Sequence, residues 1–282
     1  MKISEKYNLP ARELKFVNVD LSIDNRFFID PYKLRNGKTD QHKRCYYAVS
    51  SFIDYLLKLA KQKEYERLSQ MINNLHERNE TKFGYSLSSR YGKSFGIIAG
   101  TDLVGTLSRE NIWESGVIKD IFDCIMLIPN VGEDKVSDMV TTIILSELIT
   151  FTQEQCKLWK IPMEKKRIKK QCWNYELNDW EYKREELPVH NGRPFILVPK
   201  SFTDKQFKFS YERLYRELII PFYKKREIEL EDSEFVVQYK NGEKHVLGNL
   251  LRKRYPCTKY VVMDFIKQYD DVYREYKKKI LK

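Results

Sequence analysis

The sequence predicts an α+β fold in which a helix-rich N-terminal half packs on a small mixed or antiparallel sheet built mainly from the C-terminal half. Three observations lead to this prediction. Amphipathic helix patterns dominate the first 160 residues, hairpin patterns gather after residue 161, and the two kinds of element alternate irregularly. We expect a single domain over residues 1–282, which subdivides into a helical part, 1–160, and a sheet-containing part, 161–282.

Two short strands and a long helical segment are expected first. Residues 14–21 and 26–29 read as strands, separated by a turn at Asp24 and Asn25. Asp30 precedes a proline, which favours extended backbone, so we expect it to be a turn residue or a helix cap rather than a catalytic group. Apolar residues at helical spacing over 39–75 then predict one long helix, or two with a break near 61–63, capped by Thr39 or Asp40.

Residues 75–100 have the most unusual composition of the chain. Four glycines fall within 17 residues, and serines together with Arg90 add hydrogen-bond donors suited to phosphate. The segment matches neither the Walker A pattern nor G-x-G-x-x-G, so it predicts no nucleotide-binding fold. A long loop of this kind is either part of a functional site or a flexible surface loop.

A helix over residues 110–128 is expected to lead into the segment 131–155, around which the fold is organised. Its first turns carry Asp134 and Asp138, four residues apart, so their carboxylates share one face, away from the apolar stripe. Two such charges repel each other, and a divalent cation is a common way to offset this. The alternative is that acids in a first helical turn only complement the helix dipole.

The second half predicts hairpins, one buried strand and two more helices. The strand over 193–200 is apolar, and it places Lys200 at its end. The remaining elements are a hairpin over 171–187 that turns at Asn178–Asp179, a helix over 209–223, a hairpin over 234–247 that turns at Asn241–Gly242, and a helix over 259–281.

The charge of the chain favours a polyanionic partner. The formal net charge is +11, and residues 244–282 alone hold eleven Lys or Arg against four Asp or Glu. A second basic run covers residues 165–170. Such surfaces attract nucleic-acid phosphates, and the tyrosines and phenylalanines between them are able to stack on bases. The alternative is a solvated, lysine-rich face with no partner.

Other classes of protein are disfavoured. The chain has no apolar run long enough to cross a membrane and no apolar signal core at its start, so we expect a cytoplasmic protein without a membrane partner. Its five cysteines and four histidines are dispersed, with no C-x-x-C motif, which argues against disulfides and a structural zinc site.

Two or three carboxylates with a lysine are the metal ligands and catalytic residues typical of a metal-dependent phosphodiesterase. This set resembles the PD-(D/E)XK nuclease superfamily, in which a helix glutamate precedes an aspartate and a strand-borne (D/E)xK. The resemblance implies Glu77 or Glu80 as the helix acid, Asp134 or Asp138 as the aspartate, and the triplet 181–183, Glu-Tyr-Lys, as the last element. The chain departs from the pattern because both aspartates open a helix. Alternatively, Glu181 and Lys183 are exposed hairpin residues, and Lys200 is the lysine.

Four segments also resemble uncharacterised bacterial proteins encoded near phage-defence genes. They read FIDPYKL, HERNETKFGYS, GEDKVSDMVTTII and PFILVPKSF. This resemblance implies a restriction-like or abortive-infection effector. It marks as positions to test His76, Glu77, Glu80, Asp134, Asp138 and Lys200.

We therefore expect a metal-dependent nuclease or nuclease-like effector that acts on DNA or RNA with Mg²⁺ or Mn²⁺. The alternative is a non-catalytic nucleic-acid-binding or adaptor subunit that works with a protein partner in a defence complex, and a third interpretation is a structural protein whose acids only cap helices. The candidate residues are Glu80, Asp138 and Lys200 for catalysis; Glu77, Glu80, Asp134 and Asp138 for the metal; and Arg90, Lys93, Lys169, Lys170, Arg252, Lys253 and Arg254 for nucleic acid.

Overall fold

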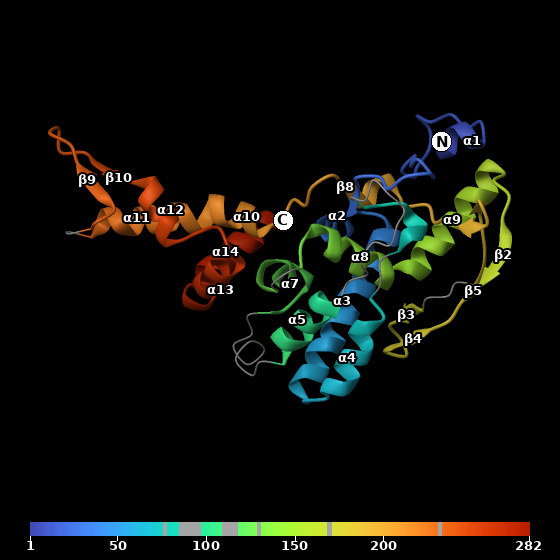
Figure 1. Cartoon of the computed structure of the whole chain (residues 1–282), viewed down its shortest axis with the longest axis horizontal. Coiled ribbons are helices and arrows are strands. Elements are labelled where there is room, and N and C mark those ends of the chain that lie inside the picture. Colours follow the sequence, from blue (N-terminus) through green and yellow to red (C-terminus); the bar gives the residue numbers. More distant parts are fainter. Residues whose placement is uncertain (76–77, 85–96, 109–117, 129–130, 168–170, 231–232) are drawn as a thin grey trace. The chain divides into compact units, whose positions relative to one another are not determined.

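The computed structural model describes residues 1–75, 78–84, 97–108, 118–128, 131–167, 171–230 and 233–282 (Figure 1). The chain divides into two compact units. Unit 1 comprises Met1–Ile121 and Asn130–Lys208, and unit 2 comprises Phe122–Pro129 and Phe209–Lys282. The sequence suggested a division at residue 160 instead, so these bounds are a finding of the structure.

The predicted α+β class is confirmed. Helices predominate, and the described strands form five antiparallel pairs of two, rather than one shared sheet. Unit 1 contains the pairs β1 (Phe28–Ile29) with β8 (Thr203–Asp204), β2 (Glu164–Arg167) with β5 (Arg184–Leu187), β3 (Cys172–Asn174) with β4 (Asp179–Glu181), and β6 (Val189–His190) with β7 (Arg193–Pro194). Unit 2 contains the pair β9 (Val236–Gln238) with β10 (Lys244–Val246).

The helices at 40–61 and 65–73 in unit 1 follow the predicted amphipathic pattern. Those at 3–6, 31–36 and 97–107 were not predicted, and the segment 131–155 forms two helices divided at Ile144. Thr39 caps α3 by accepting a hydrogen bond from the backbone N–H of His42 at 3.3 Å, and the expected break before α4 falls at Lys63, whose φ is 61°. Asp30, as expected, caps α2. The helices of this unit are α1 (Ile3–Lys6), α2 (Pro31–Asn36), α3 (Asp40–Lys61), α4 (Tyr65–Asn73), α5 (Ile97–Leu107), α8 (Glu133–Ile143) and α9 (Leu145–Trp159).

Two segments that read as strands are not ladders. Residues 14–21 contain only isolated bridges, although five of their apolar side chains are buried. Residues 195–198 are likewise buried but unpaired with any strand; their backbone bonds instead to Val17 and to Glu80. The apolar pattern therefore predicted burial correctly, whereas pairing is limited to isolated bridges in 14–21 and to Arg193–Pro194 in the predicted strand 193–200.

The core of unit 1 includes an aromatic cluster that fixes the hairpin β3–β4 against α3 and α4. Trp173 and Trp180 lie edge-on to Phe52, with ring centroids 5.0 and 5.4 Å away. Both indole N–H groups are satisfied: that of Trp173 donates to Ser51 Oγ at 3.0 Å, and that of Trp180 to the carbonyl of Met71 at 3.1 Å. This hairpin forms one wall of a pocket described below.

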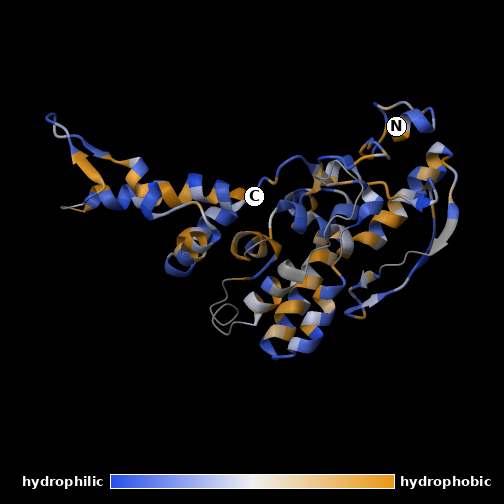
Figure 2. Ribbon diagram, in the orientation of Figure 1, coloured by the Kyte–Doolittle hydropathy of each residue, from blue (hydrophilic) through white to orange (hydrophobic). Residues whose placement is uncertain are grey.

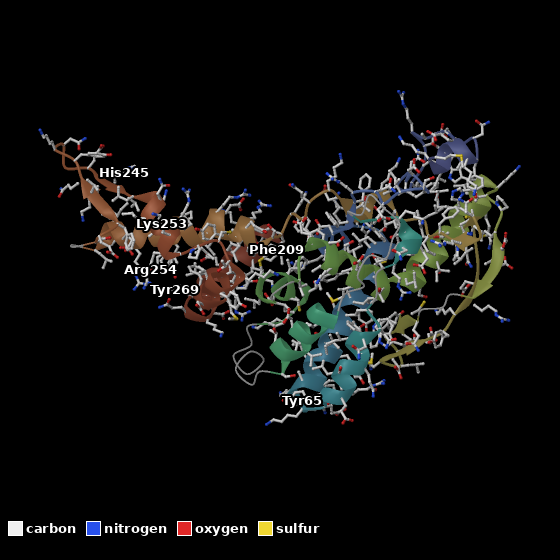
Figure 3. All side chains as sticks on the ribbon, viewed as in Figure 1. Tyr65, Phe209, His245, Lys253, Arg254 and Tyr269 are labelled. Atoms are coloured by element: carbon white, nitrogen blue, oxygen red, sulfur yellow. The ribbon has the colours of Figure 1, made fainter. Side chains whose placement is uncertain are left out.

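Unit 2 gathers around a long helical segment and a second aromatic cluster. Helix α10 (Tyr211–Leu214) continues through a π-helical turn into α11 (Ile220–Glu229), and Pro221, which has no backbone N–H, follows that turn. Tyr223 stacks on Tyr255 with centroids 3.9 Å apart, and Tyr269 lies in the same cluster (Figure 3). The predicted helix over 259–281 is broken at Tyr269 into α13 (Lys259–Gln268) and α14 (Asp270–Ile280).

Helix α7 (Ile121–Leu127) is mostly hydrophobic, as its colour in Figure 2 shows, and polar groups of unit 2 hold it at both ends. Asp123, which has no exposed surface, accepts hydrogen bonds at 2.6 Å from Tyr273 Oη and from Lys277 Nζ. Lys259 Nζ donates to the carbonyls of Ile125 and Ile128 at 2.6 and 2.8 Å. In the described part of the chain, no helix is long and apolar enough to cross a membrane.

Candidate functional site

Helix α8 carries the acidic pair on which the sequence analysis centred. Gly132 is its N-cap, and Val136 and Val140 are buried on its inner face. Ser137 accepts a hydrogen bond from the backbone N–H of Ile29 at 3.0 Å, which ties the helix to β1. This contact anchors α8, on which Asp134 is exposed and Asp138 is half-buried.

Asp134 meets an acid that the sequence analysis did not select. Burial raises the pKa of Asp134; Lys135 opposes this shift, and the negative charge of Asp24 adds to it. Burial also raises the pKa of Asp24, against the charge of Lys82. The charge of Asp24 is thus near enough to disfavour ionisation of Asp134.

Asp24 also lies beside Gly84, near the start of the glycine-rich segment 75–100. A Cβ added to Gly84 would lie 3.6 Å from Asp24 Oδ2, and φ of Gly84 is +146°, a conformation that side chains rarely adopt. The backbone N–H of Gly84 donates to the carbonyl of Asn25 at 3.1 Å. Asp24 and the beginning of this segment thus lie side by side in unit 1, and the charge of Asp24 acts on Asp134.

Glu80 lies in a different setting, beside a buried arginine. Arg78 is 1% exposed; its Nε donates to Thr142 Oγ1 at 3.1 Å and its Nη2 to the carbonyl of Gln171 at 2.9 Å. Burial lowers the pKa of Arg78, and the charge of Glu80 opposes the shift. Arg78 Nη1 and Glu80 Oε2 are both buried without a hydrogen-bond partner. The charge of Glu80 is thus balanced by an arginine.

The expected three-acid metal group does not form among the residues that the structure describes. In that part of the chain, no cluster of three or more His, Cys, Asp or Glu is able to hold a metal ion. This corrects the expectation that Glu80, Asp134 and Asp138 act as one group. Glu77 and His76 lie outside the described residues, as do Arg90, Lys93, Lys169 and Lys170.

Lys200 is exposed and opens the 3-10 turn Lys200–Phe202, immediately after the buried segment that ends at Pro199. It lines a hollow in unit 1 together with Lys205 and Asp204. The hollow does not include Glu80 or Asp138 among its lining residues.

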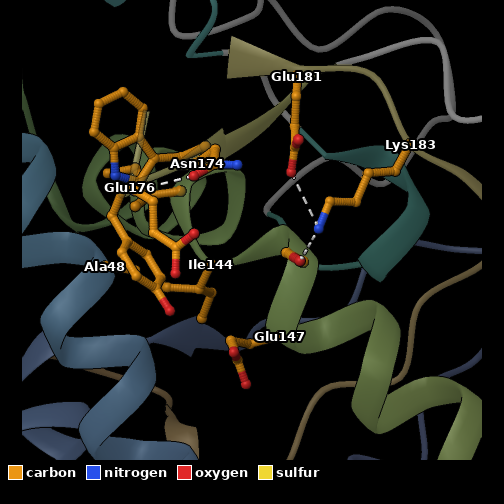
Figure 4. Close-up of a pocket in the computed structure, with 11 residues that line it drawn as sticks. Ala48, Ile144, Glu147, Asn174, Glu176, Glu181 and Lys183 are labelled. Atoms are coloured by element: carbon orange, nitrogen blue, oxygen red, sulfur yellow. Dashed lines mark hydrogen bonds and ion pairs between the residues drawn. The ribbon is translucent and has the colours of Figure 1, made fainter. Parts of the chain in front are cut away.

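Glu181 and Lys183 are better organised than exposed hairpin residues would be. Lys183 Nζ lies 3.2 Å from Glu181 Oε1 and donates to Ser146 Oγ at 2.7 Å, so all three side chains meet in one pocket (Figure 4). The pocket measures about 190 Å³ and is also lined by Glu147, whose carboxylate pairs with Arg44 at 3.0 Å. Two of the three glutamates that line the pocket, Glu147 and Glu181, are thus paired with cations.

The C-terminal basic residues are where the sequence placed them. Arg252, Lys253 and Arg254 form the last turn of α12 (Gly248–Arg254), and all three are exposed (Figure 3). No ion pair between described residues involves any of them. These three cations are therefore accessible to a polyanion.

Sequence reasoning missed Asp24 and Arg78. Asp24 reads as a turn residue, and only its separation from the hydrophobic pattern around it was visible. Arg78 stands between candidate acids in the segment 76–80, and a lone arginine there gives no sign of burial. Both become recognisable only through contacts with α8, which lies more than 50 residues away in the chain.

Comparison with known proteins gives a family but no activity. Residues 8–210 match the model of a family described as a domain of unknown function, DUF8370. No curated protein and no solved structure matches the chain. The match ends next to Phe209, where the C-terminal part of unit 2 begins. Because the match covers well over half of the 282 residues, the chain belongs to the DUF8370 family.

Proposed function

We propose that this protein binds nucleic acid, DNA or RNA, through the basic surface of unit 2. The observation that carries the proposal is the exposed run Arg252–Arg254, which no described acid neutralises. Phosphate contacts by such residues release counterions and need no particular base sequence. The excess of Lys and Arg after residue 244 supports the same conclusion.

The hairpin β9–β10 supplies the other part of this surface. It leads directly into α12, and the backbone N–H of Leu247 donates to the carbonyl of Phe235 at 2.7 Å, which fixes the junction. Tyr239 on this hairpin is 53% exposed, and His245 lies beside it with ring centroids 5.9 Å apart. Exposed rings next to cations suit stacking on unpaired bases.

The test measures binding of fluorescent 20-nucleotide single-stranded DNA, duplex DNA and RNA by anisotropy at several salt concentrations. The triple variant Arg252→Gln/Lys253→Gln/Arg254→Gln removes three cations. Each lost phosphate contact lowers the slope of log affinity against log salt by ~0.7–0.9, so we expect a decrease of about two to three.

A matched control removes three exposed lysines from α3, Lys43, Lys58 and Lys61. This control variant has the same net charge and is expected to keep the wild-type slope. Equal slopes for the wild type and the Arg252–Arg254 variant would refute the proposed surface. If basic last turns of this kind only complement the helix dipole, binding would not change at all.

A second candidate function is metal-dependent cleavage of the bound strand, which Asp24 and Asp134 favour. Mg²⁺ is commonly held by one or two carboxylates together with water and substrate phosphates, so a pair of acids fits Mg²⁺ or Mn²⁺. A metal held there would supply an activated water and charge neutralisation at the scissile phosphate. Lys82 and Lys135 lie close enough to affect the charge of this pair.

Cleavage is tested by incubating plasmid DNA and RNA with the protein and Mg²⁺ or Mn²⁺. We expect Asp24→Asn and Asp134→Asn to abolish cleavage while anisotropy shows retained binding, and Asp40→Asn, an exposed acid on α3, to leave cleavage intact. Absence of cleavage by the wild type would leave nucleic-acid binding alone. The resemblance to proteins near phage-defence genes adds a defence role to the proposal, for which plaque counts on expressing cells are the test.

A further inference from the structure

A hollow of about 500 Å³ in unit 1 has the size and the walls of a small-ligand site. It is lined by Val17, Asn18, Phe27, Lys200, Thr203, Asp204 and Lys205. Pockets for small ligands commonly measure roughly 300–1,000 Å³, and are largely apolar with a few polar groups that fix orientation. Here the apolar walls come from Val17 and Phe27, and two lysines supply charge.

The one acid in the lining is already neutralised. Lys33 Nζ lies 3.1 Å from Asp204 Oδ2 and donates to the carbonyl of Thr203 at 2.5 Å. Burial works to raise the pKa of Asp204, but the hydrogen bond from the Lys205 backbone and the ion pair with Lys33 outweigh it, so the pKa is lowered. Asp204 is therefore ionised and paired at neutral pH, and the hollow keeps the positive charge of Lys200 and Lys205.

These two lysines are free to meet an anion and stand on well-held backbone. Neither forms an ion pair with another described residue. The backbone N–H of Lys200 donates to the carbonyl of Lys15 at 2.9 Å, and Lys205 directly follows β8, which pairs with β1. Phe202, between the two lysines in the chain, and Ile29 of β1 are fully buried. The backbone of both lysines is thus held in place, and their exposed side chains remain able to turn toward an anion.

We propose that this hollow binds one nucleotide unit of a nucleic-acid strand, with its phosphate between Lys200 and Lys205 and its nucleoside against Phe27 and Val17. A free inorganic phosphate would use the lysines alone and leave the apolar walls uncovered. The proposal rests on the proposed nucleic-acid binding and adds to it a site in unit 1, remote in sequence from the basic helix of unit 2. It also gives Lys200 a role in holding phosphate.

Isothermal titration calorimetry of the full chain with thymidine 5′-monophosphate, thymidine and inorganic phosphate tests this site. We expect the monophosphate to bind more tightly than either of the other two, because only it reaches both the lysines and the apolar walls. Loss of charged hydrogen bonds in Lys200→Gln/Lys205→Gln should weaken binding of the monophosphate about tenfold or more. The matched control Lys58→Gln/Lys61→Gln removes the same charge from α3 and should bind as the wild type does.

Equal binding of thymidine and its monophosphate, or an unchanged affinity in the Lys200→Gln/Lys205→Gln variant, would overturn the proposal. Binding of inorganic phosphate as tight as the monophosphate would overturn the nucleoside part. Thermal unfolding curves that superimpose on the wild type show that the variant is folded; a variant that unfolds early is replaced by Lys200→Met/Lys205→Met, which also removes both charges and should likewise weaken binding of the monophosphate. Failure here leaves the salt slope of the Arg252–Arg254 variant unaffected, so the two proposals are distinguishable.

Discussion

Asp30 allows a stability prediction whose size follows from its surroundings. The side chain is 1% exposed; its Oδ1 accepts from the backbone N–H of Tyr32 at 2.9 Å and its Oδ2 from that of Lys208 at 3.3 Å. Burial outweighs these two hydrogen bonds and raises the pKa of Asp30 from 3.8 to about 6. Asp30→Asn keeps the acceptor for Tyr32 and removes the charge.

The raised pKa of Asp30 determines whether folding stability rises or falls with pH. Between pH 4 and 6 the folded protein holds a proton on Asp30 that the unfolded chain has already released, so stability falls as pH rises through this range and then levels off. A shift of about two pH units corresponds to ~3 kcal/mol, which is an upper estimate. The Asp30→Asn variant does not lose this stability. The difference in free energy of unfolding between the variant and the wild type should therefore shift in favour of the variant by up to ~3 kcal/mol from pH 4 to pH 7.

Urea unfolding at pH 4, 5, 6 and 7, followed by tryptophan fluorescence, measures the difference. Unit 2 contains no tryptophan, so this signal reports unit 1. Asp40→Asn is the control, because Asp40 is exposed on α3. If the wild type and Asp30→Asn keep a constant difference at all four pH values, burial does not perturb Asp30 and the reasoning is wrong.

Two buried cations give further predictions. Lys277→Ala should destabilise unit 2 by ~3–5 kcal/mol, because it leaves fully buried Asp123 without its cation. The double variant Asp123→Asn/Lys277→Met should be destabilised clearly less, and hydrogen exchange across α14 measures both variants. Arg78→Ala should destabilise unit 1 by ~3 kcal/mol, because Thr142 Oγ1 and the carbonyl of Gln171 lose their donor, and an unchanged urea midpoint by tryptophan fluorescence would contradict this.

The sequence predicts the helices of this protein better than its strands. From Tyr46 to Leu75 many apolar residues recur at helical spacing, and the structure confirms the two predicted helices, α3 and α4, and the break between them. The apolar side chains of 14–21 and 195–198 are buried without forming the predicted strand ladders. A short apolar run reports burial, whereas strand pairing depends on a partner that local sequence does not specify.

The residues of the candidate site were likewise only partly predictable from the sequence. Asp134 was found because it opens a strongly amphipathic helix, and Arg252–Arg254 because three cations in a row are visible in any sequence. Asp24 was missed because its proximity to Asp134 arises from tertiary contacts between segments about 110 residues apart. Glu80 was selected for its neighbours in sequence, but in the fold its charge acts on Arg78, which no spacing rule would have identified as buried.

The placement of α7 has a consequence for limited proteolysis. Residues 122–129 belong to unit 2, while the chain on either side of them belongs to unit 1. A single cut after Lys208 would thus release no free fragment, because the C-terminal piece would remain bound to α7 through hydrogen bonds from Lys277, Tyr273 and Lys259. The nicked protein should elute from a sizing column as one species and separate into two bands only in detergent.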